Sequence, residues 1–146
     1  RYDYFPQLAK FVLRMAGIIY ELIVEGFKGL VIEQLIDIRR GNDQVAADFA
    51  RGIHAYGSPK IERDGDSHYP DGSFVYEDTM ELGVILEVLY LQKRQDLSFF
   101  ADKYILGSNR LTQAIIGIDL KYQGKEARVI VWRLNKTKEN GETILI

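Results

Sequence analysis

The chain has 146 residues, of which 47% are apolar and 27% are charged. This composition is typical of one globular domain with a hydrophobic core, and it argues against an intrinsically disordered chain. The absence of cysteine excludes disulfides and thiolate metal sites and is compatible with an intracellular location in the cytoplasm or nucleus. No apolar run reaches the roughly 20 residues of a membrane span, so we expect no membrane partner.

The formal net charge of −2 is divided unevenly along the chain. Residues 1–88 contain 9 Lys/Arg and 15 Asp/Glu, whereas residues 89–146 contain 10 Lys/Arg and 6 Asp/Glu. An acidic half followed by a basic half is compatible with metal-binding carboxylates beside a surface that attracts phosphate. A chance imbalance on a solvated surface is the alternative.

Helical spacing of apolar residues characterises the first 56 residues. It predicts a helix over 6–25 that Gly26 and Gly29 interrupt. A second helix is predicted over 30–38 and a third, more polar one over 43–55. We therefore expect a helical N-terminal part over residues 1–56.

From Gly57 the pattern is that of strands, and Asp64-Gly65-Asp66 predicts a turn. A helix over 97–106 is expected to be a crossover between sheet strands. The predicted strands are 58–63, 74–76, 84–91, 114–122 and 127–134. This order predicts a mixed α/β or α+β domain spanning 1–146, with its core over 57–134 and a C-terminal tail over 135–146.

Two carboxylates, Asp71 and Glu87, stand out in this core. Glu87 is the single charged residue of an apolar strand. If residues 70–91 form a hairpin with its turn centred on Thr79, Asp71 faces Glu87 directly. The same register pairs Ser73 with Ile85 and Val75 with Gly83.

Opposed buried carboxylates repel each other unless one is protonated or a cation lies between them. A hard divalent ion such as Mg²⁺ takes carboxylate oxygens readily, and the backbone carbonyl of Val88 could add a third ligand. The structural alternatives are a turn in which Asp71 caps its own backbone and a pairing of Glu87 with Arg128 or Arg133. A register shift of one residue would also put the two acids on opposite faces.

These motifs, in this order, resemble the PD-(D/E)XK nuclease superfamily, which includes restriction endonucleases. Pro70-Asp71 matches the Pro-Asp that opens the second strand of that family, and Glu87 matches the glutamate of its Glu-X-Lys motif. The run from Leu86 to Arg133 also resembles uncharacterised fungal proteins with this core, and the Uma2-like branch. The resemblance covers about residues 57–134 and implies a restriction-endonuclease-like core with a central mixed sheet flanked by helices.

The resemblance implies a nuclease that uses Mg²⁺ or Mn²⁺ to hydrolyse phosphodiester bonds, with DNA rather than RNA as its partner and a homodimer as a compatible assembly. Asp71 and Glu87 would be catalytic metal ligands together with the carbonyl of Val88. Glu33, on the second predicted helix, would be an accessory acidic ligand or a solvated residue. The basic side chains expected to attract nucleic acid are Lys93, Arg94, Lys121 and Arg128.

One departure from the family is Leu89, which stands where the lysine is expected. In the family that lysine orients the attacking water and stabilises charge on the phosphate. Lys93 could replace it if the strand ends early and the chain turns back, Lys103 could do so from the helix, and Gln92 could orient water without charge. A solvated Lys93 and a catalytically inactive nuclease fold, used for interaction with nucleic acid or protein in a toxin, effector or selfish element, are the alternatives.

His68 lies three residues before Asp71 and is interpreted either as a ligand or proton shuttle or as an exposed turn residue. Tyr104 is interpreted as a core or edge aromatic.

Overall fold

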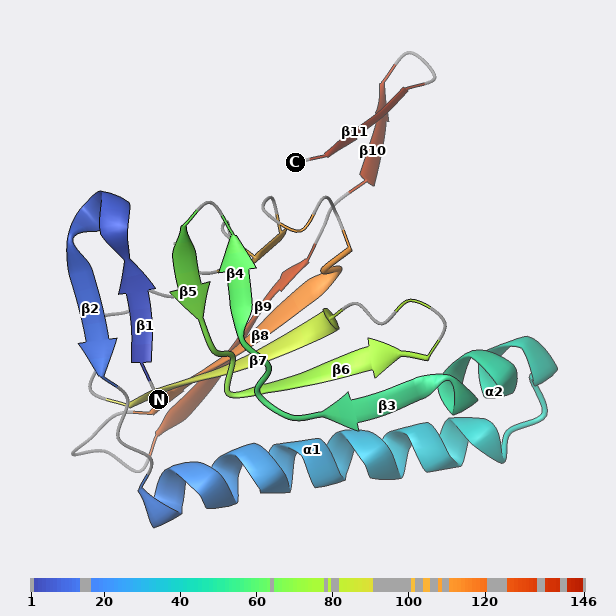
Figure 1. The fold of residues 1–146 in the computed structure, drawn as a ribbon. Coiled ribbons are helices and arrows are strands. Elements are labelled where there is room, and N and C mark those ends of the chain that lie inside the picture. The colour runs from blue at the N-terminus through green and yellow to red at the C-terminus, as the bar shows by residue number, and fades with distance from the viewer. Residues whose placement is uncertain are drawn as a thin grey trace.

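The computed structural model describes residues 2–13, 17–63, 65–77, 79, 82–90, 101, 104–105, 108, 111–120, 126–133, 136–139 and 142–145. Within these ranges, helices pack against strands that belong to a five-stranded, a four-stranded and a two-stranded sheet (Figure 1). This arrangement confirms the predicted α+β class. None of the described helices is both long and apolar enough to cross a membrane.

The N-terminal residues form a hairpin where a helix was expected. Strand β1 (Tyr2–Phe5) pairs antiparallel with β2 (Lys10–Leu13), and a short 3₁₀ turn (Pro6–Leu8) joins them. Pro6 has no N–H to donate to a preceding turn of helix, and Ala9 reverses the chain with a positive φ of 47°. The prediction of a helix from residue 6 is therefore wrong.

Helix α1 (Ile18–Arg39) is continuous and replaces two predicted helices. Its buried positions include Val24 and Leu35, which share one face of the helix. Gly26 and Gly29 lie on the exposed face and do not interrupt the helix. Two glycines cost about 1 kcal/mol each in a helix, which burial of the opposite face outweighs.

Helix α2 (Gln44–Arg51) is shorter than the predicted third helix, because the chain leaves it for strand β3 (Ile53–Tyr56). The transition occurs at Gly52, where a Cβ atom would lie 2.5 Å from Cε2 of the Tyr76 ring. Strand β3 pairs antiparallel with β6 (Gly72–Tyr76), so long-range pairing determines where the helix ends.

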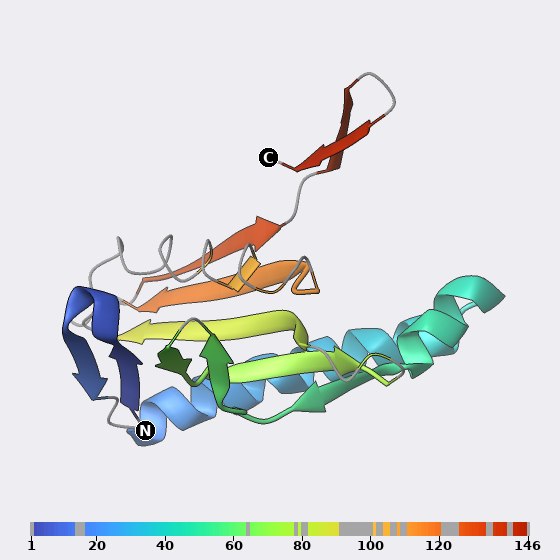
Figure 2. The same ribbon diagram turned by 45° about the horizontal axis from the view of Figure 1, so that its top comes forward.

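Strands β4 (Ile61–Arg63) and β5 (Asp66–His68) continue the sheet of the N-terminal hairpin, in the order β2-β1-β5-β4. Strand β4 confirms the later part of the strand predicted over 58–63, whereas β5 was not predicted. The turn between them contains Gly65, whose φ of +82° is the left-handed conformation that glycine tolerates. In Figure 2 strands β4 and β5 (green) lie in front of the larger sheet.

The central sheet has the order β3-β6-β7-β8-β9, and it contains β7 (Leu82–Tyr90), β8 (Ala114–Leu120) and β9 (Ala127–Arg133). Strands β7 and β8 are parallel, whereas the other neighbours are antiparallel, so the sheet is mixed. A parallel pair requires a crossover. Within the predicted crossover helix, Ala101, Tyr104 and Ile105 are helical, and the rest of 97–106 lies outside the described residues.

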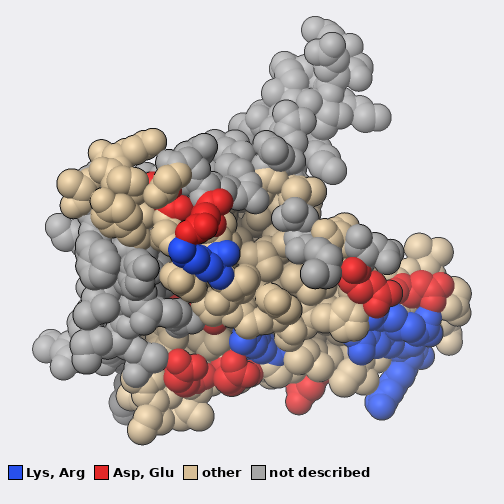
Figure 3. Space-filling model, in the orientation of Figure 1, with Lys and Arg blue, Asp and Glu red and all other residues tan. Residues whose placement is uncertain are grey.

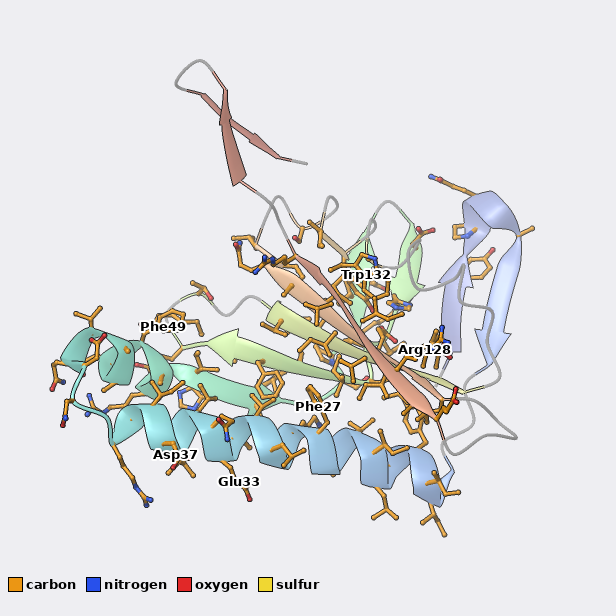
Figure 4. The ribbon with its side chains drawn as sticks, turned by 180° about the vertical axis from the view of Figure 1, so that it is seen from behind. Phe27, Glu33, Asp37, Phe49, Arg128 and Trp132 are labelled. Carbon is orange, nitrogen blue, oxygen red and sulfur yellow. The ribbon has the colours of Figure 1, made fainter. Side chains whose placement is uncertain are left out.

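Side chains cover both faces of this sheet. Helix α1 contributes Val24 to a buried cluster with Leu86, Val88 and Ile118, and Phe27 packs against it (Figure 4). On the other face Ile85 and Ile115 pack against Ala101 and Tyr104 of the crossover. Residues 135–146, predicted as a tail, include the hairpin of β10 (Lys136–Glu139) and β11 (Glu142–Leu145).

Candidate functional site

The two predicted carboxylates lie where strand β6 begins beside the middle of β7. The ladder pairs Ser73 with Ile85, as predicted, and ends at Gly72 opposite Leu86. The predicted pairing of Val75 with Gly83 is wrong, because an irregularity after Phe74 shifts the register and pairs Val75 with Leu82. The shift is on the turn side of the hairpin, so it leaves the register near the acids unchanged.

Asp71 precedes β6 and forms hydrogen bonds with the backbone of β7 on either side of Glu87. Its backbone N–H donates to the carbonyl of Leu86 at 3.0 Å, and its Oδ2 accepts from the N–H of Val88 at 2.6 Å. The carboxylate therefore occupies the place of a strand acceptor, and only 4% of the residue is exposed. Asp71 caps the neighbouring strand, whereas the turn interpretation had it capping its own backbone.

Glu87 is buried, with 1% of its surface exposed. Its Oε1 accepts a hydrogen bond from the hydroxyl of Tyr104 at 2.8 Å and lies 3.2 Å from Nε2 of His68. Arg128 and Arg133, the predicted alternative partners, are exposed on β9 at the edge of the sheet, two strands away. A phenol and an imidazole thus contribute to the compensation of the buried acid.

His68 and Tyr104 are the site residues whose role the sequence did not reveal. His68 belongs to β5 and is 6% exposed, so the interpretation as an exposed turn residue is wrong. The rings of His68 and Tyr104 are tilted, with their centroids 4.9 Å apart. One signal was present in the sequence: a buried tyrosine hydroxyl usually finds a hydrogen-bond partner, and Glu87 was the unexplained polar group of the core.

Val88 and Leu89 complete the local geometry of β7. The side chain of Val88 packs in the cluster beneath α1, while its N–H points to Asp71. The N–H and C=O of one residue point to the same side of an extended strand, so the carbonyl of Val88 is also directed toward the β6 side. Leu89, at the family's lysine position, shares the sheet face of Glu87 and is 1% exposed.

Two of the remaining predicted site residues, Glu33 and Arg128, belong to the described part of the chain. Glu33 is exposed on α1 and points away from the sheet, and Arg128 is exposed near the beginning of β9 (Figure 4). Acidic and basic side chains are interspersed near the α2 end of the face in Figure 3, where Arg51 pairs with Asp48. Outside the described residues lie Gln92, Lys93, Arg94, Lys103 and Lys121.

The ligand atoms available at this site are of the type that a hard divalent cation prefers. Asp71, Glu87 and the Val88 carbonyl offer oxygen, which Mg²⁺ and Mn²⁺ prefer. Across the described part of the chain, no three His, Cys, Asp or Glu side chains form a group that could hold a metal. Mg²⁺ commonly takes one or two carboxylates and completes its coordination with water and substrate oxygens, so two acids are a sufficient protein contribution.

Antiparallel strands leading into a parallel β7–β8 pair, with a helix on one face, match the restriction-endonuclease-like core that the resemblance implies. A solved structure with this fold is that of a protein from Anabaena variabilis ATCC 29413, described as a candidate nuclease belonging to DUF820. It superposes with a TM-score of 0.55 at 13% sequence identity, over 88% of this chain and 75% of the other. No protein-family model matches the chain, and no curated protein matches it.

Proposed function

We propose that the protein is a divalent-metal-dependent nuclease of the PD-(D/E)XK superfamily that hydrolyses phosphodiester bonds, with DNA as its substrate. The observation that carries the proposal is the position of Asp71. Its backbone and carboxylate bracket Glu87 on β7, in a sheet whose fold is shared with a candidate nuclease. Two buried acids at one point of a sheet are costly for stability alone, and ligation of a cation explains why both are present.

In the proposed reaction the oxygen of water forms a bond to phosphorus, and one ester oxygen leaves with a proton. When bound, Mg²⁺ or Mn²⁺ supplies positive charge for the phosphate and acidifies a water molecule. Asp71, Glu87 and the Val88 carbonyl would hold that ion at the β6–β7 junction. Lys93 orients the attacking water in place of the family lysine, and Arg94, Lys121 and Arg128 attract the phosphate backbone.

The proposal is tested by incubating the purified protein with Mn²⁺ or Mg²⁺ and with supercoiled plasmid, single-stranded DNA or RNA. Cleavage is expected for DNA in the presence of metal, and Asp71→Ala should abolish it. Asp37→Ala is the matched control, because Asp37 is exposed on α1 and points away from the sheet (Figure 4). Absence of cleavage by the unmodified protein, or cleavage that survives Asp71→Ala, would rule the proposal out.

A second candidate is a nuclease fold that has lost catalysis and serves as a nucleic-acid or protein interaction module. The observation that favours it is Leu89, which is 1% exposed and fills the lysine position on the Glu87 face with an apolar side chain. Titration calorimetry separates the two candidates. A module without catalysis would release no heat with millimolar Mn²⁺, and it would bind DNA equally well before and after Asp71→Ala.

A further inference from the structure

We propose that Tyr104 and His68 are positioning residues that hold the carboxylate of Glu87 in the orientation that binds the metal ion. The inference rests on the proposed metal site and assigns two residues that the Pro-Asp and Glu-X-Lys motifs do not include. Tyr104 comes from the crossover between β7 and β8, and His68 comes from the small sheet. Two elements from different parts of the chain therefore converge on one side chain of β7.

Both contacts are made to the same oxygen. Oε1 of Glu87 accepts from the Tyr104 hydroxyl at 2.8 Å and lies 3.2 Å from Nε2 of His68. A carboxylate only accepts hydrogen bonds, so the second contact is made by the tautomer that carries its proton on Nε2. Two donors from different directions fix the rotation of the carboxyl group about its last side-chain bond, and this orientation is the property that metal ligation requires.

The hydroxyl of Tyr104 is not needed for packing. The ring lies in an apolar cluster with Ile85, Ala101 and Ile115, and a phenylalanine ring would fill the same space. Burial of a hydroxyl is unfavourable unless it is hydrogen-bonded, so its presence here is explained by the acceptor at Glu87. The same reasoning applies to His68, which is 6% exposed and contacts the Tyr104 ring.

This arrangement gives Glu87 two hydrogen-bond donors on the sheet face where the family lysine is missing. Leu89, two residues along the strand, offers no donor to the carboxylate. Tyr104 carries no positive charge and His68 carries one only when it is protonated, so neither of them is a permanent cation beside the acid. A lysine in contact with the same oxygens would compete with the metal for the negative charge of the carboxylate.

The test is the affinity for Mn²⁺, measured by titration calorimetry on the whole chain without DNA. Tyr104→Phe should weaken Mn²⁺ binding by about tenfold, since loss of a group that orients a metal ligand typically costs 10- to 100-fold. Tyr56→Phe is the matched control, because Tyr56 is 53% exposed on β3, and its affinity should equal that of the unmodified protein. His68→Leu should weaken binding similarly, and His68→Gln, which keeps a donor, should restore most of it.

Nuclease assays add a readout that a merely structural role would not affect. Cleavage by Tyr104→Phe should fall at limiting Mn²⁺ and recover at saturating Mn²⁺, with circular dichroism showing an unchanged fold.

If Tyr104→Phe binds Mn²⁺ as tightly as the unmodified protein, the positioning role is refuted and the nuclease proposal stands. If the unmodified protein binds Mn²⁺ and Tyr104→Phe weakens that binding, but DNA is not cut, the nuclease proposal fails and the positioning role stands. If the unmodified protein binds no Mn²⁺, both are refuted.

Discussion

At the scale of single residues, Glu87 shows how a buried acid is tolerated. With 1% of its surface exposed, it depends on its contacts with Tyr104 and His68. Glu87→Gln keeps an oxygen that can accept both hydrogen bonds, so the free energy of unfolding should change by less than about 1 kcal/mol. Glu87→Ala removes the acceptor and leaves a cavity, and it should cost about 2–4 kcal/mol. Urea unfolding of the metal-free protein measures both changes.

Both variants should also lose metal binding, so a difference in stability between them does not come from bound metal. If Glu87→Gln and Glu87→Ala destabilise the protein equally, the hydrogen bonds to Tyr104 and His68 contribute little to folding. If Glu87→Gln is clearly more stable than the unmodified protein, the negative charge is a net cost that is retained for its use in binding a cation.

Sequence reasoning identified Asp71 and Glu87 because each is a local anomaly: a Pro-Asp at a strand start and one acid within an apolar strand. It did not identify the partners of Glu87. His68 and Tyr104 lie 19 and 17 residues away along the chain, and each belongs to a different element from Glu87. A hydrogen bond between side chains brought together by the tertiary fold leaves no periodic signal, so it could be read only from the structure.

At the scale of elements, the exposed face of α1 offers a simple test of helix propensity. No heavy atom outside the local backbone lies within 4 Å of a Cβ built at Gly26 or Gly29. Gly26→Ala and Gly29→Ala should therefore each raise the free energy of unfolding by about 0.5–1 kcal/mol. Gly52→Ala, where a Cβ would collide with the Tyr76 ring, should instead lower it, and thermal unfolding of the three variants gives the comparison.

Helix α2 depends on its first residue for a hydrogen-bonded start. The side chain of Asp43 accepts from the N–H groups of Val45 and Ala46 at 3.0 and 3.1 Å. Asp43→Ala should therefore cost about 1 kcal/mol, while Asp43→Asn should recover most of that loss. Unfolding in urea distinguishes the variants, and equal stability of Asp43→Ala and Asp43→Asn would contradict a capping role.

The elements that were predicted well are those whose pattern is complete within their own segment. Strands β7, β8 and β9 were expected within two residues of their observed bounds, because β-branched and aromatic runs between turns specify them. Strand β2 and most of β3 were assigned to helices, because their apolar residues also fit a helical spacing. Pairing of β2 with β1 and of β3 with β6 decides in favour of the strand, and such pairing is a property of the fold rather than of the segment.

At the scale of the whole molecule, the site is formed by residues from both the five-stranded and the four-stranded sheet. The five-stranded sheet supplies Glu87 and the strand that Asp71 caps, whereas β5 of the four-stranded sheet supplies His68. The predicted strands include β6, β7, β8 and β9 of the first sheet, in the order that the resemblance to PD-(D/E)XK nucleases implies. The resemblance did not imply that β4, the strand expected over 58–63, belongs to a second sheet, in which residues near the N-terminus pair with β5.

The proposed DNA substrate also makes a prediction for the surface as a whole. Binding to phosphate releases counterions, so DNA affinity without metal should fall linearly with salt on logarithmic axes. Arg128 is exposed near the beginning of β9, and Arg128→Ala should reduce the slope of that line by about 1 while weakening all DNA sequences alike. Arg51→Ala is the matched control, because Arg51 lies on α2 and is paired with Asp48. Fluorescence anisotropy with labelled DNA at several salt concentrations measures both slopes, and an equal change in the two variants would place the DNA elsewhere than along β9.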